Sequence, residues 1–270
     1  MAEQAKGPAM TPDPWAGRHV IITGGTSGIG LAAAELLLAA GARVTAIGRA
    51  DRQLAELAAR PRPGLAVAAA DVGEPEQLAA AMDVGRAAHG PAGALITCTG
   101  ILPPGYCTGL TDADLRRHLE VSYFGTVHAI RLALPDLLRA DQASITCVTS
   151  AAGFLGASGY SGPSKFAIGG LCEVLRQDLL PRGITVTVVC LDDADTPALA
   201  AETLTARSGG ERAVSPERVA RDLLAGTAAG QALVLPGAEA RALHQAAGLF
   251  ARDLDAAIAR AAARGHTALR

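Results

Sequence analysis

Short apolar runs alternate with longer Ala- and Leu-rich segments along most of this chain. Each run is rich in β-branched residues and apolar on consecutive positions, which is typical of strands buried on both faces of a parallel sheet. The segments between them are long enough for right-handed crossover helices. The runs are His19–Thr23, Arg43–Gly48, Leu65–Ala69, Ala94–Thr97, Ser144–Thr149, Thr185–Cys190 and Ala232–Leu235. This rhythm predicts an α/β fold, a Rossmann-type doubly wound seven-stranded parallel sheet in a single domain.

The same pattern sets the expected domain organisation. Residues 1–14 are polar and proline-containing, without the features of a secretory signal, so we expect a flexible tail. Residues 15–237 form the predicted Rossmann-type domain, and residues 238–270 extend it with an Ala-rich helix. Helical patterns predict four further helices, Glu74–Ala88, Asp112–Leu138, Pro163–Leu180 and Glu239–Arg264. We expect Thr196–Ser215 to be a mobile segment that contains one helix and can cover a site.

Composition excludes several classes of partner. The chain has 270 residues, half of them hydrophobic, and a net charge of −2. We therefore expect no nucleic-acid partner and no attraction to an anionic membrane. No apolar run approaches the roughly 20 residues of a transmembrane helix. The five cysteines form no Cys-x-x-Cys pair and no zinc-ligand spacing, so we expect no metal site and a reducing, cytoplasmic location.

A glycine-rich turn follows the first predicted strand, and a helix from Leu31 to Ala40 is predicted after it. Glycines in such a turn let the backbone approach a pyrophosphate. The helix that follows offers free N–H groups and the positive end of its dipole. We therefore expect a nicotinamide dinucleotide at this turn. The expected cofactor contacts are Gly24, Thr26, Ser27, Gly28, Ile29 and Gly30.

The residues after the second and third strands indicate which dinucleotide is preferred. An acidic residue after the second strand would bind the ribose 2′-hydroxyl of NAD(H), but this chain has Arg49 there. A guanidinium pairs well with a 2′-phosphate, so Arg49 favours NADP(H) over NAD(H). In the alternative, Arg49 and Arg52 simply begin an exposed helix. Asp71 and Val72 follow the third strand, where the carboxylate could accept from the adenine amino group, cap the next helix, or do both.

These motifs resemble the short-chain dehydrogenase/reductase family over roughly residues 17–235. The likeness rests on the glycine turn, on Asp71-Val72, and on Ser150 followed by a tyrosine and a lysine. Around Ser164–Ile168 and Asp195–Pro197 the chain is similar to the branch that contains 3-ketodihydrosphingosine reductases. The resemblance implies an oxidoreductase that reduces a ketone or oxidises a secondary alcohol. The branch implies a small-molecule substrate that is largely apolar.

The resemblance also implies a mechanism. A tyrosine gives a proton to the carbonyl while the nicotinamide gives hydride, a serine bonds the carbonyl oxygen, and a lysine binds the ribose and lowers the tyrosine pKa. Ser150 matches the serine, and Lys165, one of only two lysines in the chain, matches the lysine. Gly100 matches the last residue of a cofactor-lining turn, and Thr196 matches a residue near the nicotinamide.

The catalytic side departs from the family pattern. The family tyrosine stands four residues before the lysine, where this chain has Ser161, and Tyr160 stands five before. On a continuous helix five residues turn about 500°, which misses the lysine face by about 140°. If the helix begins at Pro163, Tyr160 lies in the preceding loop and is free of that limit. Ser122 replaces the family asparagine that holds a relay water.

Two hypotheses follow. In the first, the protein is an NADP(H)-dependent oxidoreductase with Ser150, Tyr160, Lys165 and Ser122 as its catalytic residues. In the second, the fold and pocket persist but the proton relay has eroded, leaving a non-redox enzyme or a cofactor-binding partner. Several other polar groups stay open: Asp192 and Asp193 as a base or as loop charge, Tyr106 and Cys107 as substrate contacts, and His118 and His128 as exposed or hydrogen-bonded histidines. The resemblance implies a homodimer or homotetramer through the two long helices.

Overall fold

The computed structural model describes residues 13–101, 109–150, 161–191, 214–238, 240–242 and 244–245. Its centre is one seven-stranded sheet in the order β3-β2-β1-β4-β5-β6-β7, with every neighbouring pair parallel. This is the predicted doubly wound, Rossmann-type α/β fold. The strand order reverses between β1 and β4, so connections leave these neighbours towards opposite faces and open a crevice at their carboxyl ends.

The strands lie where the apolar runs predict them. Four match the predicted bounds, β5 and β6 are each one residue longer at both ends, and β7 is shorter. The longer forms of β5 and β6 pair in register along their whole length, up to Ser150 opposite Leu191. The strands are β1 His19–Thr23, β2 Arg43–Gly48, β3 Leu65–Ala69, β4 Ala94–Thr97, β5 Ala143–Ser150, β6 Ile184–Leu191 and β7 Leu233–Val234.

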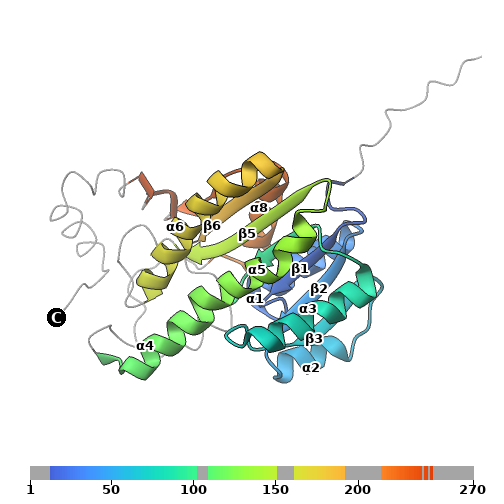
Figure 1. Cartoon of the computed structure of the whole chain (residues 1–270), viewed down its shortest axis with the longest axis horizontal. Helices are drawn as coiled ribbons and strands as arrows, with labels where there is room; N and C mark the ends of the chain where they lie inside the picture. Colours follow the sequence, from blue (N-terminus) through green and yellow to red (C-terminus); the bar gives the residue numbers. More distant parts are fainter. Residues whose placement is uncertain are drawn as a thin grey trace, which may run out of the picture.

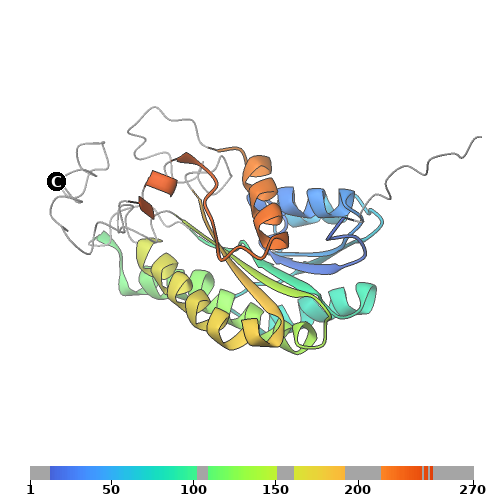
Figure 2. The ribbon, with the colours of Figure 1, turned by 90° about the horizontal axis from the view of Figure 1, so that it is seen from above.

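Helices cover both faces of the sheet (Figures 1 and 2). The helix α1 packs against α8 on one face, whereas α3, α5 and α6 lie on the other, each over its own part of the core. No described helix has both the length and the apolarity needed to cross a membrane. The helices are α1 Gly28–Ala39, α2 Arg52–Ala58, α3 Pro75–His89, α4 Asp112–Leu119, α5 Gly125–Leu137, α6 Ser161–Leu179 and α8 Pro216–Ala228.

The expectation of a single continuous helix over Asp112–Leu138 is wrong in the middle of that range. A π-helical turn, η2 (Glu120–Phe124), separates α4 from α5 and has the buried Ser122 at its centre. The Thr126 hydroxyl donates to the Ser122 carbonyl at 3.1 Å. At Gly125 a Cβ would lie 2.5 Å from Val72 Cγ2, so the chain passes unusually close to the loop after β3. A wider turn of this kind is common at functional sites and is not visible in hydrophobic periodicity.

Two other helix boundaries differ from the sequence expectations. The helix α6 already includes Ser161, so it does not begin at Pro163, and Pro163 lies inside its first described turn, which proline tolerates. The helix α8 fills one of the expected crossover segments, but its bounds were not predicted. Its signals were present, because the Ser215 hydroxyl caps the Arg218 N–H and Pro216 occupies the first helical position. Of the C-terminal extension, residues 238, 240–242 and 244–245 are helical.

A buried carboxylate joins two helices behind the site. Asp136 on α5 is 4% exposed and accepts from Arg86 Nε on α3 at 2.7 Å. It also accepts from the Ala92 N–H at 3.3 Å and from Arg139 at 3.2 Å. Burial acts to raise the pKa of Asp136, but these hydrogen bonds and the Arg86 charge outweigh it, so the pKa is lowered and the carboxylate stays charged.

Replacing this carboxylate should cost much more than replacing an exposed one on the same arginine. We expect Asp136→Ala to lower the free energy of unfolding by about 2–4 kcal/mol, because it leaves a half-buried guanidinium and a buried N–H without their partner. Asp83 also pairs with Arg86, at 2.7 Å, but is 71% exposed. The control Asp83→Ala should therefore cost less than about 1 kcal/mol. Urea denaturation measures both, and equal losses would contradict this account.

Candidate cofactor and catalytic site

The glycine turn between β1 and α1 has no room for side chains. Gly24 has a φ of +70°, and a Cβ there would lie 2.9 Å from the carbonyl carbon of Cys98 and from the Thr99 nitrogen. A Cβ on Gly30 would lie 2.1 Å from the Gly24 carbonyl oxygen. The turn is therefore held tightly between β4 and the start of α1. Its backbone can come within contact distance of a bound group, as a pyrophosphate requires.

The N-terminus of α1 is open for an anion. Ser27 is the N-cap, its side chain makes no capping hydrogen bond, and the first turn carries no acidic residue. The first N–H groups and the positive end of the dipole therefore remain available for a phosphate. Thr26 differs from the expectation in one respect. A Cβ on Gly48 would lie 2.2 Å from Thr26 Oγ1, so this buried side chain packs over the end of β2 rather than into the turn.

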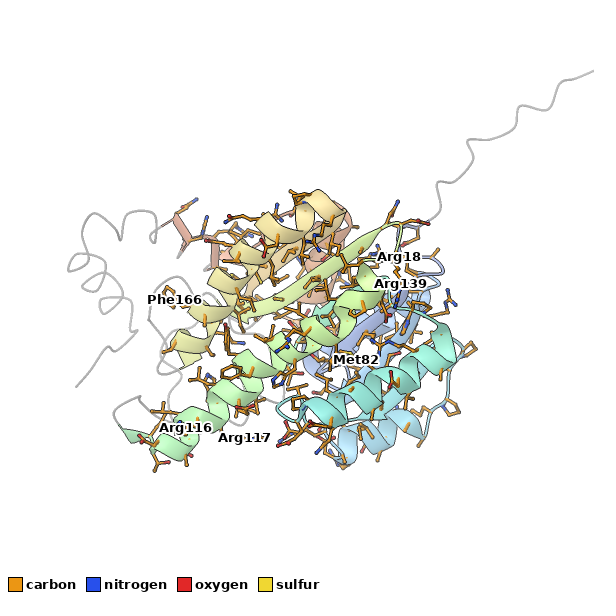
Figure 3. The ribbon with its side chains drawn as sticks, viewed as in Figure 1. Arg18, Met82, Arg116, Arg117, Arg139 and Phe166 are labelled. Atoms are coloured by element: carbon orange, nitrogen blue, oxygen red, sulfur yellow. The ribbon has the colours of Figure 1, made fainter. Side chains whose placement is uncertain are left out.

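Two charged residues follow the neighbouring strands. Arg49 comes directly after β2 and is exposed, as a group that meets a 2′-phosphate must be. Asp71 follows β3 and is half-buried, and its carboxylate accepts from the Gly73 N–H at 2.9 Å and pairs with Arg117. The side chain of Arg117 extends from α4 to make this pair (Figure 3). The Arg117 contact was not expected from the sequence. Arg117 binds one carboxylate oxygen of Asp71, and the Gly73 N–H binds the other.

Burial acts to raise the pKa of Asp71. The Arg117 and Gly73 hydrogen bonds, with the charges of Arg117 and Arg49, outweigh that effect and lower its pKa. Asp71 therefore stays a carboxylate, able to accept a hydrogen bond from an amino group. Val72 is buried against Gly125 and so anchors the loop after β3, which carries Asp71.

Lys165 lies beside the turn after β4. A Cβ on Gly100 would lie 3.4 Å from Lys165 Nζ and 3.9 Å from Ser122 Oγ. The Ile101 N–H donates to Ser122 Oγ at 3.4 Å, a long hydrogen bond that joins this turn to η2. The structure thus brings Gly100, Lys165 and Ser122 together, although they come from three separate elements.

Three cysteine thiols influence the pKa of the Lys165 amino group. Burial lowers the pKa of Lys165, and interactions with Cys98, Cys190 and Cys147 act in the opposite direction. Burial also raises the pKa of Cys98 to about 12 and that of Cys190 to about 11, so both are neutral thiols at physiological pH. These cysteines are structural neighbours rather than nucleophiles. Among the described residues there is no cluster of three or more potential metal ligands.

Ser150 is the last residue of β5 and lies at the carboxyl edge of the sheet, beside the end of β6. That edge is where ligands bind in doubly wound sheets. Other predicted site residues lie outside the described part of the chain. They are Tyr160, Thr196, Asp192, Asp193, Tyr106 and Cys107. The described helix α6 begins one residue after Tyr160.

One polar pair near Lys165 was not anticipated. The His118 ring is 2% exposed, and its Nε2 lies 2.8 Å from Ser164 Oγ, which is fully buried. The expectation that His118 is a hydrogen-bonded histidine is confirmed, but its partner beside Lys165 was missed. The available signal was its spacing, because His118 stands four residues before Ser122 and so shares its side of the helix. His128 bonds the Val72 carbonyl at 3.2 Å.

Comparison with known proteins identifies the family. A model of the short chain dehydrogenase family matches residues 18–206. The chain therefore belongs to the short-chain dehydrogenase family, whose members are oxidoreductases, and the resemblance expected from the motifs is confirmed.

Among similar sequences, 3-ketodihydrosphingosine reductase of Dictyostelium discoideum is 31% identical over 239 residues, which cover 78% of this chain and 72% of that protein. The 3-dehydrosphinganine reductase of Danio rerio is 30% identical over 210 residues, covering 73% of this chain and 63% of that protein. The chain thus spans about two thirds of the length of these relatives.

Among solved structures, a short chain dehydrogenase from Burkholderia cenocepacia in complex with NADP has a TM-score of 0.76 and 26% identity, covering 92% of this chain and 98% of that one. The 3-ketoacyl-(acyl-carrier-protein) reductase from Brucella melitensis, complexed with NADH, has a TM-score of 0.75 and 19% identity, covering 82% of this chain and 96% of that one. The second likeness concerns the fold alone.

A charge at the helix start should separate anion binding from folding. In Ser27→Asp the new residue is as good an N-cap as serine, so thermal stability should be unchanged or higher. Its carboxylate would repel a pyrophosphate, so affinity for NADPH and NADH should fall at least tenfold. Ser215→Asp makes the same change at the N-cap of α8 and should leave binding unchanged. Calorimetric titration measures these affinities, and undiminished binding by Ser27→Asp would exclude the turn as the pyrophosphate site.

Proposed function

We propose that this protein is an NADP(H)-dependent oxidoreductase that interconverts a ketone and a secondary alcohol. The observation that carries the proposal is the placement of Lys165 Nζ beside Gly100, at the same carboxyl edge as the open glycine turn and Ser150. A bound cofactor and substrate need protein groups for the phosphates, the ribose and the reacting carbonyl, in that order along one crevice. Family membership supports this hypothesis over the alternative of a non-redox or regulatory protein with an eroded relay.

The described residues fit a nicotinamide dinucleotide. At Gly24 and Gly30 an added Cβ would meet backbone atoms, so the turn is tight and a ligand can approach its backbone, and the N-terminus of α1 is uncapped by any side chain. In this proposal the turn and helix hold the pyrophosphate, Arg49 pairs with the 2′-phosphate, and Asp71 accepts from the adenine amino group. Lys165 holds the nicotinamide ribose. The cofactor supplies or receives the hydride.

The chain's own residues would manage the proton. Tyrosine ordinarily titrates near 10, so a fixed cation beside it is needed for proton transfer near neutral pH. Lys165 is that cation in our proposal, Tyr160 is the proton donor, and Ser150 donates to the carbonyl oxygen. Ser122, whose hydroxyl accepts from the Ile101 N–H, stands where the family has its relay asparagine. It keeps the turn carrying Gly100 in contact with η2.

The relatives suggest the kind of ketone. Several of them are named for 3-ketodihydrosphingosine or 3-dehydrosphinganine, each a ketone on a long chain. We propose a small-molecule, largely apolar ketone as substrate. The cytoplasmic location expected from the sequence stays a prediction.

A homodimer or homotetramer is also part of the proposal. Large apolar side chains are exposed at η2, just after α5, and on α6, including Phe124 at 44%, Leu138 at 43%, Phe166 at 46% and Val174 at 55%. Phe166 points away from the body of the molecule (Figure 3). Burying such groups against a second copy would remove them from water, which stabilises association by about 25 cal/mol per Å² of apolar surface buried.

Reversing one charge should test the cofactor preference. Arg49→Glu removes a cation from the 2′-phosphate and offers a carboxylate to a free ribose hydroxyl, so the affinity ratio of NADPH to NADH should fall by at least 100-fold. Arg52→Glu is the matched control, because Arg52 is exposed and contacts Glu56 at 3.5 Å. That variant should keep the wild-type ratio. An unchanged ratio in Arg49→Glu would assign the preference to another residue.

Removing one hydroxyl should test the proton donor. In a panel of aliphatic and aromatic ketones with NADPH, Tyr160→Phe should lose at least a hundredfold in kcat, as expected when a general acid is lost. Its affinity for NADPH should be unchanged. Tyr123→Phe serves as the control, since Tyr123 packs against the core and Phe124. Equal turnover by wild type and Tyr160→Phe would remove Tyr160 from the mechanism.

A further inference from the structure

A buried histidine contacts the serine that directly precedes the lysine of the proposed site. His118 belongs to the last turn of α4, and its Nε2 is 2.8 Å from the hydroxyl of Ser164 on α6. Both side chains are almost completely buried, at 2% and 0% exposure. A polar pair withdrawn from water to this extent is stable only with its hydrogen bonds made, so its geometry is held closely.

The pair links three elements around Lys165. Ser164 directly precedes Lys165 on α6, so fixing the serine fixes the backbone from which the lysine extends. The Ile101 N–H donates to Ser122 Oγ in η2, which directly follows the helix that carries His118. The turn after β4, the α4–η2 junction and the first turns of α6 therefore meet at one point. Lys165 Nζ lies against that turn at Gly100.

The charge around the ring favours its neutral form. Burial lowers the pKa of His118, the charge of Lys165 lowers it further, and the Ile101 backbone opposes both. Among the described residues next to His118 along the chain, Arg117 pairs with Asp71 and Glu120 lies beside Gly73. On the described part of the turn after β4, residues 98–101, the titratable group is Cys98, which is a neutral thiol because burial raises its pKa to about 12.

We propose that His118 is a positioning residue for Lys165, acting through Ser164, and that it holds the lysine in its working place only while the ring is uncharged. A neutral ring can accept from the Ser164 hydroxyl at Nε2. A protonated ring cannot accept, and it places a second cation next to Lys165. The Ser164 contact then breaks or reverses, and the lysine moves away from the added charge. The consequence for catalysis rests on the proposed function, but the coupling itself does not.

The sign of the pH effect follows from the direction of the shift. Because the pKa of His118 in the folded protein is below its ordinary value of 6.5, the ring is neutral at pH 7 and protonates only as the pH falls below 6.5. Binding of NADPH and turnover should therefore be full at neutral pH and fall on the acid side. Above that transition they should be independent of His118 titration.

The composition of the chain allows a direct measurement without cofactor or substrate. Lys6 and Lys165 are its only lysines, so labelling lysine with 13C at Cε yields two NMR signals in the whole protein. A Lys6→Arg background assigns the signal of Lys165. In wild type this signal should shift with an inflection below pH 6.5. In His118→Gln, whose side-chain amide reaches the position of Nε2 and accepts from Ser164 but does not titrate, the inflection should be absent.

Two further variants separate positioning from bulk packing. His118→Leu keeps an apolar side chain of similar size but removes the group at Nε2 that contacts Ser164, so NADPH affinity should fall at least fivefold at every pH. His118→Gln should keep neutral-pH affinity within about twofold and lose the acid-side fall. His128→Asn changes the other histidine of this helical stretch, which bonds the Val72 carbonyl, and should leave the Lys165 signal as in wild type.

The outcomes separate this inference from the proposed function. A Lys165 signal without an inflection, or one whose inflection persists in His118→Gln, overturns the inference even if ketones are reduced. An inflection that disappears in His118→Gln supports it, even if no ketone is turned over. If ketones are reduced, loss of the acid-side fall in kcat/KM of His118→Gln extends the support to catalysis. Wild-type NADPH affinity in His118→Leu would remove the role assigned to Ser164.

Discussion

The parallel pairing of β1 with both β2 and β4 is the constraint on which the site depends. Because the strand order reverses there, the connections from β1 and β4 leave towards opposite faces and the turn at Gly24 enters a crevice. The turn can enter only because Gly24 and Gly30 lack side chains, with closest approaches of 2.9 and 2.1 Å for an added Cβ. Strand order and two missing side chains together determine where a phosphate can sit.

A half-buried cation organises the other end of the crevice. Burial lowers the pKa of Lys165 and three thiols oppose that effect, with no described carboxylate among the groups that shift it. Among the described residues its charge therefore has no carboxylate partner, and the amino group can bind an outside partner such as a ribose hydroxyl or a phenol. In an ion pair within the fold the same lysine would be less able to do this chemistry.

The wide turn at Ser122 connects the two ends. A regular helix would carry Asp112–Leu138 straight past the loop after β3, whereas the π-helical turn brings Gly125 against Val72 and Ser122 towards Ile101. On the same stretch Arg117 reaches Asp71 on the adenine side, and His118 reaches Ser164 on the lysine side. Neighbouring residues of one helix thus support both halves of the proposed cofactor site.

The sequence by itself determined the parts that depend on local pattern. Bounds of β1 to β4, the glycine turn, and the positions of Arg49, Asp71 and Ser150 at strand ends follow from apolar runs and turn chemistry within a few residues. Only the tertiary structure decided the pairs that join distant segments. Two such pairs are Arg117 with Asp71 and His118 with Ser164, whose members are 46 residues apart in the sequence. Both pairs depend on the orientation of α4 relative to the π-helical turn that follows it. A periodic pattern shows which face is buried, but the exact partner of a polar group is set by packing between elements.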